Sequence, residues 1–451
     1  KVVAVQGLGF VGSVMALVVA NALTEEYAVI GVDLPGEATY SKIKFINEGV
    51  FPVSSSDKKV DEFYQNALRK GNLFATFDPY AYSVANIVID DINLDVKKTS
   101  DRNKSAMQTV AGNTRQNALV LIETTVPPGT CEKIVVPIFR NAYKERGLSE
   151  EFMIGHSYER VMPGADYIDS IQNFYRVYSG IDEKSADATE TFLRSIIHVD
   201  KFPLTRLHST TASEMSKVLE NSFRAMNIAF IQEWSSFAEE AAVNLYEVID
   251  AIRMRPTHRN IMSPGLGVGG YCLPKDPLLA SWSRQQLFGS KEGLKQSENA
   301  VNLNDRMPLH TFEIIKKRVG SLEGRRIGML GVSYLSNVGD TRYSPAGFLY
   351  DLFLNAGTNV IVTDGFVPCW TEKNLTPVSL EEFLQMKPEI LVYCTRHDYF
   401  KVANALEHFL DVSSDLTIVD AVGMLEQAEI ERLQKKHRVI VIGRGDLNKH
   451  R

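Results

Sequence analysis

The sequence has few cysteines, no long hydrophobic run and no excess of positive charge. Its four cysteines form no CxxC pair and have no clustered histidines nearby, so we predict neither a metal site nor a disulfide framework. No stretch approaches the roughly 18 consecutive apolar residues of a membrane span. The net charge of -6 argues against a general binder of nucleic acid or anionic membranes. Because the first residues show no basic leader, we expect the chain in the reducing cytoplasm.

What the sequence does contain is an alternation of strand and helix patterns. A chain of 451 residues is too long for one ordinary core, so two or three domains are expected. Short β-branched runs such as "ANIVIDDI" and "ALVLIETTV" alternate with helical stretches up to about residue 205. The same rhythm returns from Arg325 onward. The expected fold class is therefore α/β, with two doubly wound parallel sheets.

The middle of the chain is helical. From Thr210 to about Asn244 there is no glycine or proline, which predicts one helix of roughly 50 Å. Thr211 and Glu214 have the spacing of a capping box. "LYEVIDAIRMR" predicts a second helix, and further helix is expected to about residue 305. We therefore place domain boundaries at 1–205, 206–305 and 306–451.

"GLGFVG" follows the first strand and opens a helix. Gly7 permits a tight turn, Gly9 lets the backbone approach a pyrophosphate, and Gly12 lets helix and strand pack closely. Asp33 ends the next strand, where an acid accepts hydrogen bonds from a ribose 2'-hydroxyl and repels a 2'-phosphate. This pattern predicts an NAD site rather than an NADP site. The alternative is an ordinary glycine turn with a solvated aspartate.

"GVGGYCLPKDP" places Cys272 after several glycines and just before Lys275 and Asp276. The glycines leave room for a ligand to approach, and the charged pair can assist proton transfer. A small buried cysteine is the alternative. On the long helix, Lys217 and Asn221 lie four residues apart on one face, where they can stabilise an oxyanion or form a solvated stripe.

Nearly the whole chain resembles the UDP-glucose/GDP-mannose dehydrogenase family. The motifs that carry this resemblance occur in order: "GLGFVG", "TTVPPGT", "ERVMPG", "SKVLENSFRAMNIAF", "GVGGYCLPKDP" and "GDTRYSP". The resemblance implies an enzyme that oxidises C6 of a nucleotide sugar twice, from alcohol to carboxylate, with two NAD+. It also implies an NAD-binding Rossmann domain at 1–205, a helical dimerisation domain at 206–305 and a UDP-sugar-binding domain at 306–451.

The resemblance implies a role for each motif residue. Cys272 would be the nucleophile, Lys217 and Asn221 would stabilise the oxyanion, and Asp276 with Thr125 would hold the water. Glu159 would lie near the sugar, Lys275 would organise the loop, Arg342 would reach the cofactor diphosphate and Arg259 would cross a dimer contact. The predicted cofactor-binding set is Gly7, Gly9, Phe10, Val11, Gly12, Asp33, Thr125 and Arg342. The predicted substrate-binding set is Glu159, Arg160, Lys217, Asn221, Arg259, Gly269 and Lys275.

Several departures from the family pattern affect the choice of sugar. Leu335, Ser336 and Asn337 stand where a lysine is common before "DTR", and Tyr158 replaces a proline. "VDAVGML" lacks a common arginine, and "DINLDVKKTSDRNKSAMQ" replaces a "TP" loop. We expect a UDP-N-acetylhexosamine or UDP-glucose as substrate, with a slight preference for the N-acetylhexosamine. GDP-mannose oxidation, a two-electron hydroxyacid-type dehydrogenase and a catalytically silent nucleotide-sugar binder are the alternatives.

The long helix also predicts self-association. Its apolar residues lie on more than one side: Met226, Ile228, Phe230, Ile231, Trp234 and Phe237. A surface helix needs only one apolar stripe. We therefore expect a homodimer or a larger homo-oligomer. The alternative is a helix buried on all sides within a large monomer.

Overall fold

The computed structural model describes residues 1–52, 55, 57–92, 99–161, 164, 166–402, 405–411 and 415–448. The chain forms two compact units. Unit 1 comprises Lys1–Glu220 and Leu279–Gly293, and unit 2 comprises Asn221–Leu278 and Leu294–Arg451. The three domains predicted from the sequence remain a prediction. The part of the "DINLDVKKTSDRNKSAMQ" segment at 93–98 lies outside the described residues.

Unit 1 is built on one sheet with the strand order β3-β2-β1-β4-β5-β6-β7-β8. All neighbouring strands are parallel except β6 and β7, which pair antiparallel, so the prediction of a parallel sheet is wrong at this pair. An antiparallel pair needs no crossover helix, and among the described residues between these two strands the short α7 is the one helix. The strands are β1 Val2–Gln6, β2 Ala28–Val32, β3 Leu73–Thr76, β4 Ile87–Asp90, β5 Leu119–Ile122, β6 Met153–His156, β7 Val177–Gly180 and β8 Thr205–Arg206.

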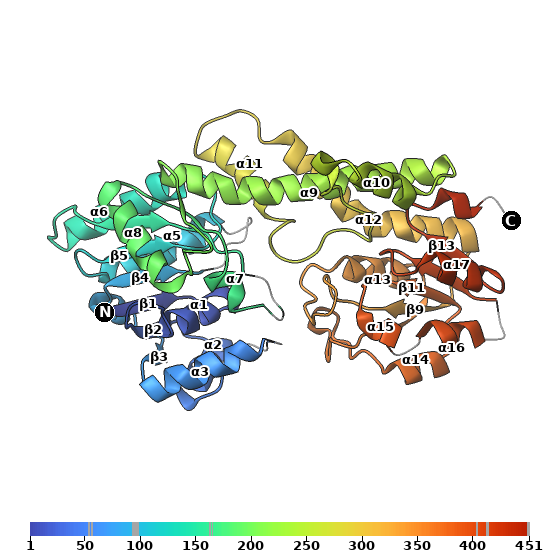
Figure 1. Cartoon of the computed structure of the whole chain (residues 1–451), viewed down its shortest axis with the longest axis horizontal. Helices are drawn as coiled ribbons and strands as arrows, with labels where there is room; N and C mark the ends of the chain where they lie inside the picture. The colour runs from blue at the N-terminus through green and yellow to red at the C-terminus, as the bar shows by residue number, and fades with distance from the viewer. Residues whose placement is uncertain are drawn as a thin grey trace. The chain divides into compact units, whose positions relative to one another are not determined.

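Helices cover both faces of this sheet (Figure 1). On β1, Val3 and Val5 pack into one apolar cluster with α1, α3 and α8, whereas Ala4 packs into a second cluster with α5 and α6. This alternation follows from the two-residue period of a strand. The helices are α1 Phe10–Ala20, α2 Glu37–Glu48, α3 Lys58–Lys70, α4 Ala81–Val84, α5 Thr99–Asn113, the π-helical turn η2 Cys131–Val135, α6 Val136–Glu145, α7 Asp169–Gln172 and α8 Glu183–Ile196.

Unit 2 contains a parallel sheet with the strand order β10-β9-β11-β12-β13. Its two faces pack against α12 and α13 on one side and against α14, α16 and α17 on the other. Both sheets confirm the predicted α/β class. The strands are β9 Arg326–Leu330, β10 Asn359–Thr363, β11 Ile390–Tyr393, β12 Thr417–Asp420 and β13 Arg438–Val441. The helices wholly within unit 2 are α10 Leu245–Arg253, η3 Pro256–His258, α12 Lys295–Val319, α13 Pro345–Asn355, η4 Thr371–Lys373, α14 Leu380–Gln385, α15 Asp398–Val402, α16 Ala405–Asp411, α17 Gln427–Gln434 and η5 Gly445–Asn448.

Two helices contain a unit boundary, α9 Thr210–Glu240 and α11 Asp276–Gln286. α9 ends at Glu240, four residues before the predicted end at Asn244. Ala242 adopts a left-handed conformation with φ of 57°, and the Asn244 side chain accepts the backbone N–H groups of Tyr246 and Glu247. The asparagine therefore caps the next helix instead of extending α9.

The predicted capping box is also wrong. The backbone N–H of Ala212 donates to Ser209 Oγ at 3.2 Å, so Ser209 caps α9 in place of Thr211. Glu214 instead accepts backbone N–H groups from a distant loop. A second correction concerns α12, which continues through Pro308 to Val319 and so passes the predicted helix end near residue 305. Within the described residues, no helix combines the length and apolarity needed to cross a bilayer.

Candidate active site

The glycine loop between β1 and α1 has the geometry that its sequence predicts. Gly7 has φ of +91°, a left-handed conformation that side chains disfavour. A Cβ on Gly12 would lie 1.9 Å from the carbonyl oxygen of Gly7, so α1 can start here only with glycine at this position. A Cβ on Gly9 would meet no atom within 4 Å. The loop thus leaves open space beside Gly9, where a pyrophosphate can approach the helix N-terminus.

Asp33 lies beside this loop, directly after β2. Its Oδ2 accepts the backbone N–H of Leu8 at 3.2 Å, and its Oδ1 accepts that of Leu34 at 2.8 Å. The carboxylate is therefore held against the glycine loop and is half-buried. Phe10 begins α1 and stacks on Tyr167, with 4.5 Å between the ring centroids. Phe10 thus packs one end of the glycine loop. Cofactor contacts of Phe10 and Val11 remain a prediction.

A buried polar cluster lies at the carboxyl ends of β4 and β5. Arg176 forms one ion pair with Glu123 at 2.9 Å, and both side chains are almost fully buried. Both carboxylate oxygens of Asp91 are buried without a hydrogen-bond partner among the described residues. Burial raises the pKa of Asp91, and neighbouring Glu123 raises it further. Burial also raises the pKa of Glu123, against the opposing effect of Arg176.

Glu214 connects the "TTVPPGT" segment to α9. Its carboxylate accepts the backbone N–H of Gly129 at 2.5 Å and that of Cys131 at 2.8 Å. Burial raises the pKa of Glu214 to about 7, although these hydrogen bonds oppose the shift. Thr125, earlier in the same loop, is half-buried. The helix and the loop are thereby fixed to each other within unit 1.

Lys217 lies one turn further along α9 and is largely buried. Its Nζ donates to the backbone carbonyl of Glu159 at 2.9 Å and lies 5.3 Å from the centre of the Tyr158 ring. The "ERVMPG" segment is described at Glu159–Val161 and Gly164, and its Met162 and Pro163 lie outside the described residues. Arg160 forms an ion pair with Glu220 at 2.9 Å. The structure therefore brings Lys217 and Glu159 together in unit 1.

Cys272, Asn221 and Asp276 come together in unit 2. Asn221 Nδ2 donates to Asp276 Oδ2 at 2.6 Å. The backbone N–H groups of Lys275 and Asp276 donate to the carbonyl of Cys272 at 3.0 and 2.8 Å, which closes a turn just before α11. Cys272 is exposed, so the alternative of a small buried cysteine is wrong.

The glycines before Cys272 make room for a neighbouring loop. A Cβ on Gly269 would lie 2.5 Å from Cβ of Tyr334, and one on Gly270 would lie 2.7 Å from the ring of Tyr334. The Gly270 N–H donates to the carbonyl of Arg342 at 3.0 Å. These glycines therefore accommodate protein packing, in addition to any ligand that binds there.

Three cationic side chains of unit 2 differ in their surroundings. Lys275 Nζ lies 4.5 Å from the centre of the Tyr271 ring and 3.6 Å from Asp276, which fits its predicted role in organising the loop. Hydrogen bonds to Asp340 raise the pKa of Arg342. Arg259 follows η3 and is exposed. Its proposed role across a dimer contact remains a prediction.

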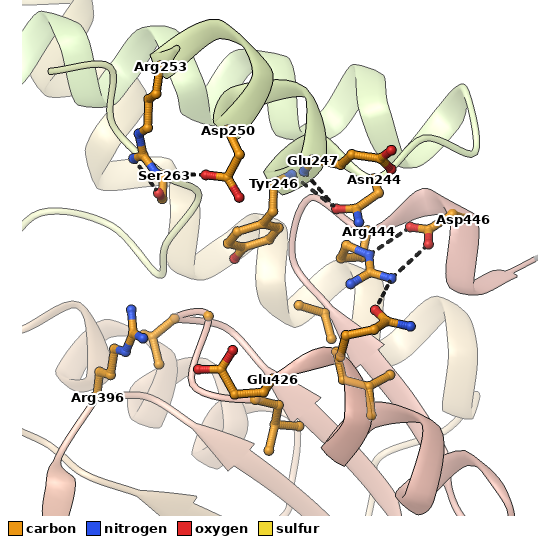
Figure 2. A pocket seen from close by; sticks show the side chains of 16 residues that line it. Asn244, Tyr246, Glu247, Asp250, Arg253, Ser263, Arg396, Glu426, Arg444 and Asp446 are labelled. Atoms are coloured by element: carbon orange, nitrogen blue, oxygen red, sulfur yellow. Dashed lines mark hydrogen bonds and ion pairs between the residues drawn. The ribbon is translucent and has the colours of Figure 1, made fainter. Parts of the chain in front are cut away.

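Unit 2 also contains a cavity of about 730 Å³ at the carboxyl ends of β11, β12 and β13 (Figure 2). Arg396, Gly423 and Arg444 follow these three strands, and Tyr246 of α10 lies opposite them. Arg444 is bound by Asp446, whereas Arg396 is exposed and has no hydrogen bond or ion pair among the described residues. The Tyr246 hydroxyl is buried without a hydrogen-bond partner in that part of the chain. Ligands of open α/β sheets bind at such strand ends.

Comparison with known proteins gives one consistent result. Residues 1–197 match the NAD binding domain of the UDP-glucose/GDP-mannose dehydrogenase family, and residues 211–306 match its central domain. The UDP-N-acetyl-D-mannosamine dehydrogenase of Pyrococcus horikoshii is 33% identical over 417 residues, covering 89% of this chain and 91% of the relative. The chain belongs to the UDP-glucose/GDP-mannose dehydrogenase family.

Solved structures agree with this membership. A UDP-D-ManNAc dehydrogenase structure from Pyrococcus horikoshii matches with a TM-score of 0.82 and 30% identity, over 99% of this chain and 100% of that chain. An NDP-N-acetyl-D-galactosaminuronic acid dehydrogenase structure from Methanosarcina mazei Go1 matches with a TM-score of 0.83 and 26% identity, over 100% and 97%. This member of the family is an NAD-dependent nucleotide-sugar dehydrogenase. The glycine loop and Asp33 fit NAD because the space beside Gly9 is open and the carboxylate lies next to it.

Sequence reasoning missed several residues around the predicted site of this dehydrogenase. The sequence pattern predicts a capping role for Glu214 and does not indicate Asp91 or Tyr334. An acidic residue directly after a buried strand, as at Glu123, is a signal that could have indicated the polar cluster. No local signal indicates Tyr334, because its contact with Gly269 joins segments about 65 residues apart.

Proposed function

We propose that the enzyme oxidises C6 of a UDP-N-acetylhexosamine to the corresponding UDP-uronic acid in a four-electron reaction. The observation that carries this proposal is the exposed Cys272 in a turn that ends at Asp276, whose carboxylate accepts a hydrogen bond from Asn221. A dehydrogenase that stops at an aldehyde needs no thiol. The thiol provides the covalent route from the aldehyde to the acid.

The covalent steps of the proposed reaction take place at Cys272. The Cys272 thiolate adds to the aldehyde carbon, and the resulting thiohemiacetal carries the hydrogen and oxygen that a second oxidation requires. Loss of hydride from this carbon gives a thioester. Water then adds, the C–S bond breaks, and the carboxylate and the thiolate are released.

The polar residues assist these steps. Lys217 and Asn221 donate hydrogen bonds to the oxygen that becomes negative during thiolate addition and hydrolysis. Asp276 accepts a proton from the attacking water, which Thr125 helps to hold. When bound, NAD+ would supply the hydride acceptor for each oxidation, so one sugar would consume two NAD+ and one water and release three protons. Glu159 and Arg160 are proposed to lie near the sugar.

The identity of the sugar rests on similarity. The Pyrococcus horikoshii relative is named for UDP-N-acetyl-D-mannosamine, and the Methanosarcina mazei structure for an N-acetyl-D-galactosaminuronic acid. Both names support an N-acetylhexosamine and differ in the epimer. UDP-glucose and GDP-mannose are the alternatives, and turnover measured across a panel of UDP- and GDP-sugars tests the choice. Faster turnover of UDP-glucose than of every N-acetylhexosamine would contradict the proposal.

We assign the nucleotide part of the substrate to unit 2 and propose that it uses the cavity in Figure 2. The cavity volume of about 730 Å³ is within the usual range for small-molecule sites. Arg396 offers a cation without an ion-pair partner among the described residues, which suits a diphosphate. In Arg396→Ala the KM for UDP-sugar should rise roughly tenfold while the KM for NAD stays constant. An unchanged KM for UDP-sugar would remove the cavity from this assignment.

The experiment that tests the overall reaction is its stoichiometry. We expect two NADH for each sugar consumed and a uronate product identified by mass spectrometry. One NADH per sugar with an aldehyde or ketone product would support the two-electron alternative. Nucleotide-sugar binding without NADH would support the catalytically silent alternative.

A further inference from the structure

We propose that His397 is a positioning residue that fixes the loop Ser333–Tyr343 and, through that loop, the backbone around Cys272. The significance for catalysis rests on the function proposed above. The contacts themselves are a property of unit 2 alone, and they can be tested without any substrate.

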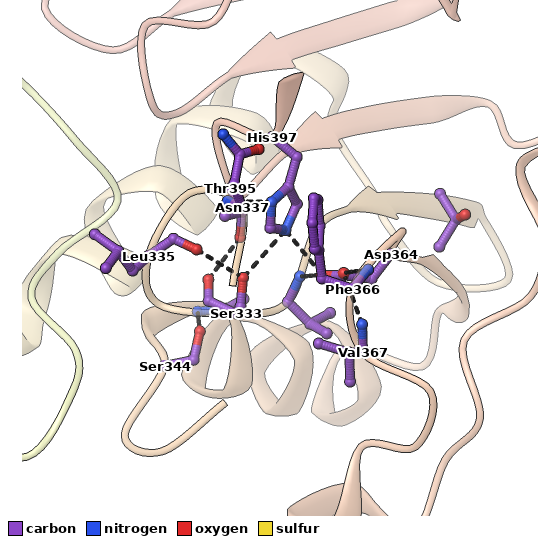
Figure 3. A network of polar contacts seen from close by, with 12 residues as sticks. Ser333, Leu335, Asn337, Ser344, Asp364, Phe366, Val367, Thr395 and His397 are labelled. Carbon is purple, nitrogen blue, oxygen red and sulfur yellow. Dashed lines mark hydrogen bonds and ion pairs between the residues drawn. The ribbon is translucent and has the colours of Figure 1, made fainter. Parts of the chain in front are cut away.

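The network joins the carboxyl ends of three neighbouring strands (Figure 3). Ser333 follows β9, Asp364 follows β10 and His397 follows β11. All three side chains are buried, and the His397 ring lies 4.8 Å from the Phe366 ring. A Ser, a His and an Asp together suggest a hydrolytic triad, but the Ser333 hydroxyl donates to the carbonyl of Leu335 at 3.0 Å and lies in the protein interior. It is therefore unavailable as a nucleophile.

The hydrogen bonds determine which nitrogen of His397 carries the proton. The backbone N–H of Asn337 donates to Nδ1 at 2.8 Å, so Nδ1 has no hydrogen. Nε2 then carries the hydrogen and lies 3.2 Å from Asp364 Oδ2 and 3.1 Å from Ser333 Oγ. Although burial raises the pKa of Asp364, hydrogen bonds from His397 and from backbone N–H groups hold it below its usual range, so this acceptor stays ionised. The imidazole is thus a neutral bridge between Asp364 and the loop.

The loop that His397 holds contains unfavourable backbone conformations. Asn337 has φ of 59° and Tyr343 has φ of 51°. Such a conformation costs free energy, most of all for a bulky residue such as tyrosine, and persists only where the surroundings enforce it. Asn337 receives that support from the His397 bond and from a reciprocal pair of hydrogen bonds with Asp398, at 2.8 and 3.0 Å.

The other end of the loop forms part of the wall behind the cysteine segment. Tyr334 occupies the space that side chains on Gly269 and Gly270 would need, and the Arg342 carbonyl accepts the Gly270 N–H. The rings of Tyr343 and Tyr271 lie 6.1 Å apart, and Tyr271 directly precedes Cys272. A continuous series of contacts therefore runs from His397 through the loop to the residues beside the thiol.

Two substitutions separate the two hydrogen bonds of the imidazole. In His397→Asn the amide oxygen can occupy the position of Nδ1, so the acceptor for Asn337 is kept and the donor to Asp364 is lost. In His397→Gln the amide nitrogen can occupy the position of Nε2, so the donor is kept and the acceptor is lost. His397→Phe removes both and keeps an aromatic ring against Phe366. The proposal ranks these variants, because the bond that Asn337 donates to Nδ1 is the His397 contact that reaches the left-handed part of the loop.

Hydrogen exchange followed by mass spectrometry tests this ranking on the whole chain. In His397→Gln and His397→Phe, exchange of peptides covering 333–343 and 267–276 should accelerate roughly tenfold, while His397→Asn stays within about twofold of the parent. Peptides covering β12 and β13 serve as the internal control. Equal acceleration in all three variants, or acceleration throughout the sheet, would reduce His397 to a core-packing residue and overturn the proposal.

Kinetics then connects the loop to the reaction. For His397→Gln we expect kcat for uronate formation to fall roughly tenfold, with the Kd for NAD unchanged and with His397→Asn close to the parent. Loosened loops with unchanged kcat and unchanged KM for the sugar nucleotide would overturn the catalytic part of the proposal. A parent enzyme that forms no uronate would contradict the proposed function instead, and the exchange result would still decide the structural part.

Discussion

Cys272 differs from the other three cysteines in its surroundings. Cys131 and Cys394 are buried, and burial raises the pKa of both thiols, which keeps them protonated and unreactive. Cys369 is exposed but lies outside any residue set that we assign to the reaction. Cys272 alone combines exposure with a glycine-rich approach and a helix start close behind it. We therefore base the proposed reactivity of Cys272 on its position, because the residue type is the same at all four sites.

Cys272→Ser should lower uronate formation at least about a thousandfold, because a hydroxyl at neutral pH is a far poorer nucleophile than a thiolate. The Kd for NAD should not change. Uronate is measured by mass spectrometry, with Cys369→Ser as the matched control that should keep full activity. Normal turnover by Cys272→Ser would exclude the covalent mechanism.

Asp33 contributes both a hydrogen-bond acceptor and a negative charge, and two substitutions separate them. Asp33→Ala should weaken NAD binding roughly tenfold and relax the rejection of NADP, since both properties are lost. Asp33→Asn keeps one acceptor, so NAD binding should fall less while the rejection of NADP relaxes similarly. Calorimetric titration with both cofactors measures this. If the preference for NAD survives in both variants, the carboxylate only supports the Leu8 and Leu34 backbone.

At the scale of the element, the sequence predicts those structural features that depend on residues close together in the chain. The glycine loop was predictable because the turn at Gly7 and the close packing at Gly12 are set by residues within one short segment. The end of α9 was not, because Asn244 serves the following helix. The hydrogen bonds of Glu214 were not predictable either, because Gly129 lies 85 residues away. Long-range hydrogen bonds leave no periodic trace in the sequence.

Glu214 couples α9 to its loop in a pH-dependent way. Its pKa is raised from 4.5 to about 7 in the folded protein, so between these values the folded state binds more protons than the unfolded state. Folding stability contributed by this residue should therefore fall as pH rises through that window, by at most about 1.4 kcal/mol per pH unit.

Glu214→Gln cannot titrate and should show a shallower decline of stability. Urea denaturation of parent and variant at pH 5, 6 and 7 measures the two slopes, and Glu145→Gln, at the exposed end of α6, is the control. Identical slopes for the parent and Glu214→Gln would show that the carboxyl group does not titrate in this range.

At the scale of the whole molecule, the exposed side of α9 supports our proposal of a homodimer. Phe223, Phe230, Trp234 and Phe237 are 56%, 51%, 45% and 58% exposed, and their spacing places them along one face of the helix. Elsewhere around the helix, Ala225, Ala229 and Ile231 are buried. The alternative of a helix buried on all sides is wrong for this chain. A row of exposed aromatic residues is typical of a surface that another protein covers.

Trp234→Glu should shift the enzyme from dimer to monomer, because a charge placed in an apolar contact loses its hydration. Light scattering at micromolar concentration measures the mass, and Lys184→Gln on α8, which changes the net charge by the same one unit, is the control. Activity of the monomer should fall if Arg259 acts across the contact. A monomeric parent with full activity would remove both the dimer and that role of Arg259.

Because α9 is one continuous helix across the unit boundary, the directions of its side chains around the helix axis are fixed relative to one another. Lys217 and Asn221 lie on one face because four residues make about 400°, little more than one full turn. A single alanine inserted between them would rotate one relative to the other by about 100° and would place the ammonium and the amide on different sides. A loop can change its conformation to absorb an inserted residue, whereas a continuous helix cannot. The number of residues between Lys217 and Asn221 therefore sets the relative direction of the two donors. Point substitutions elsewhere in α9 cannot restore that direction after an insertion.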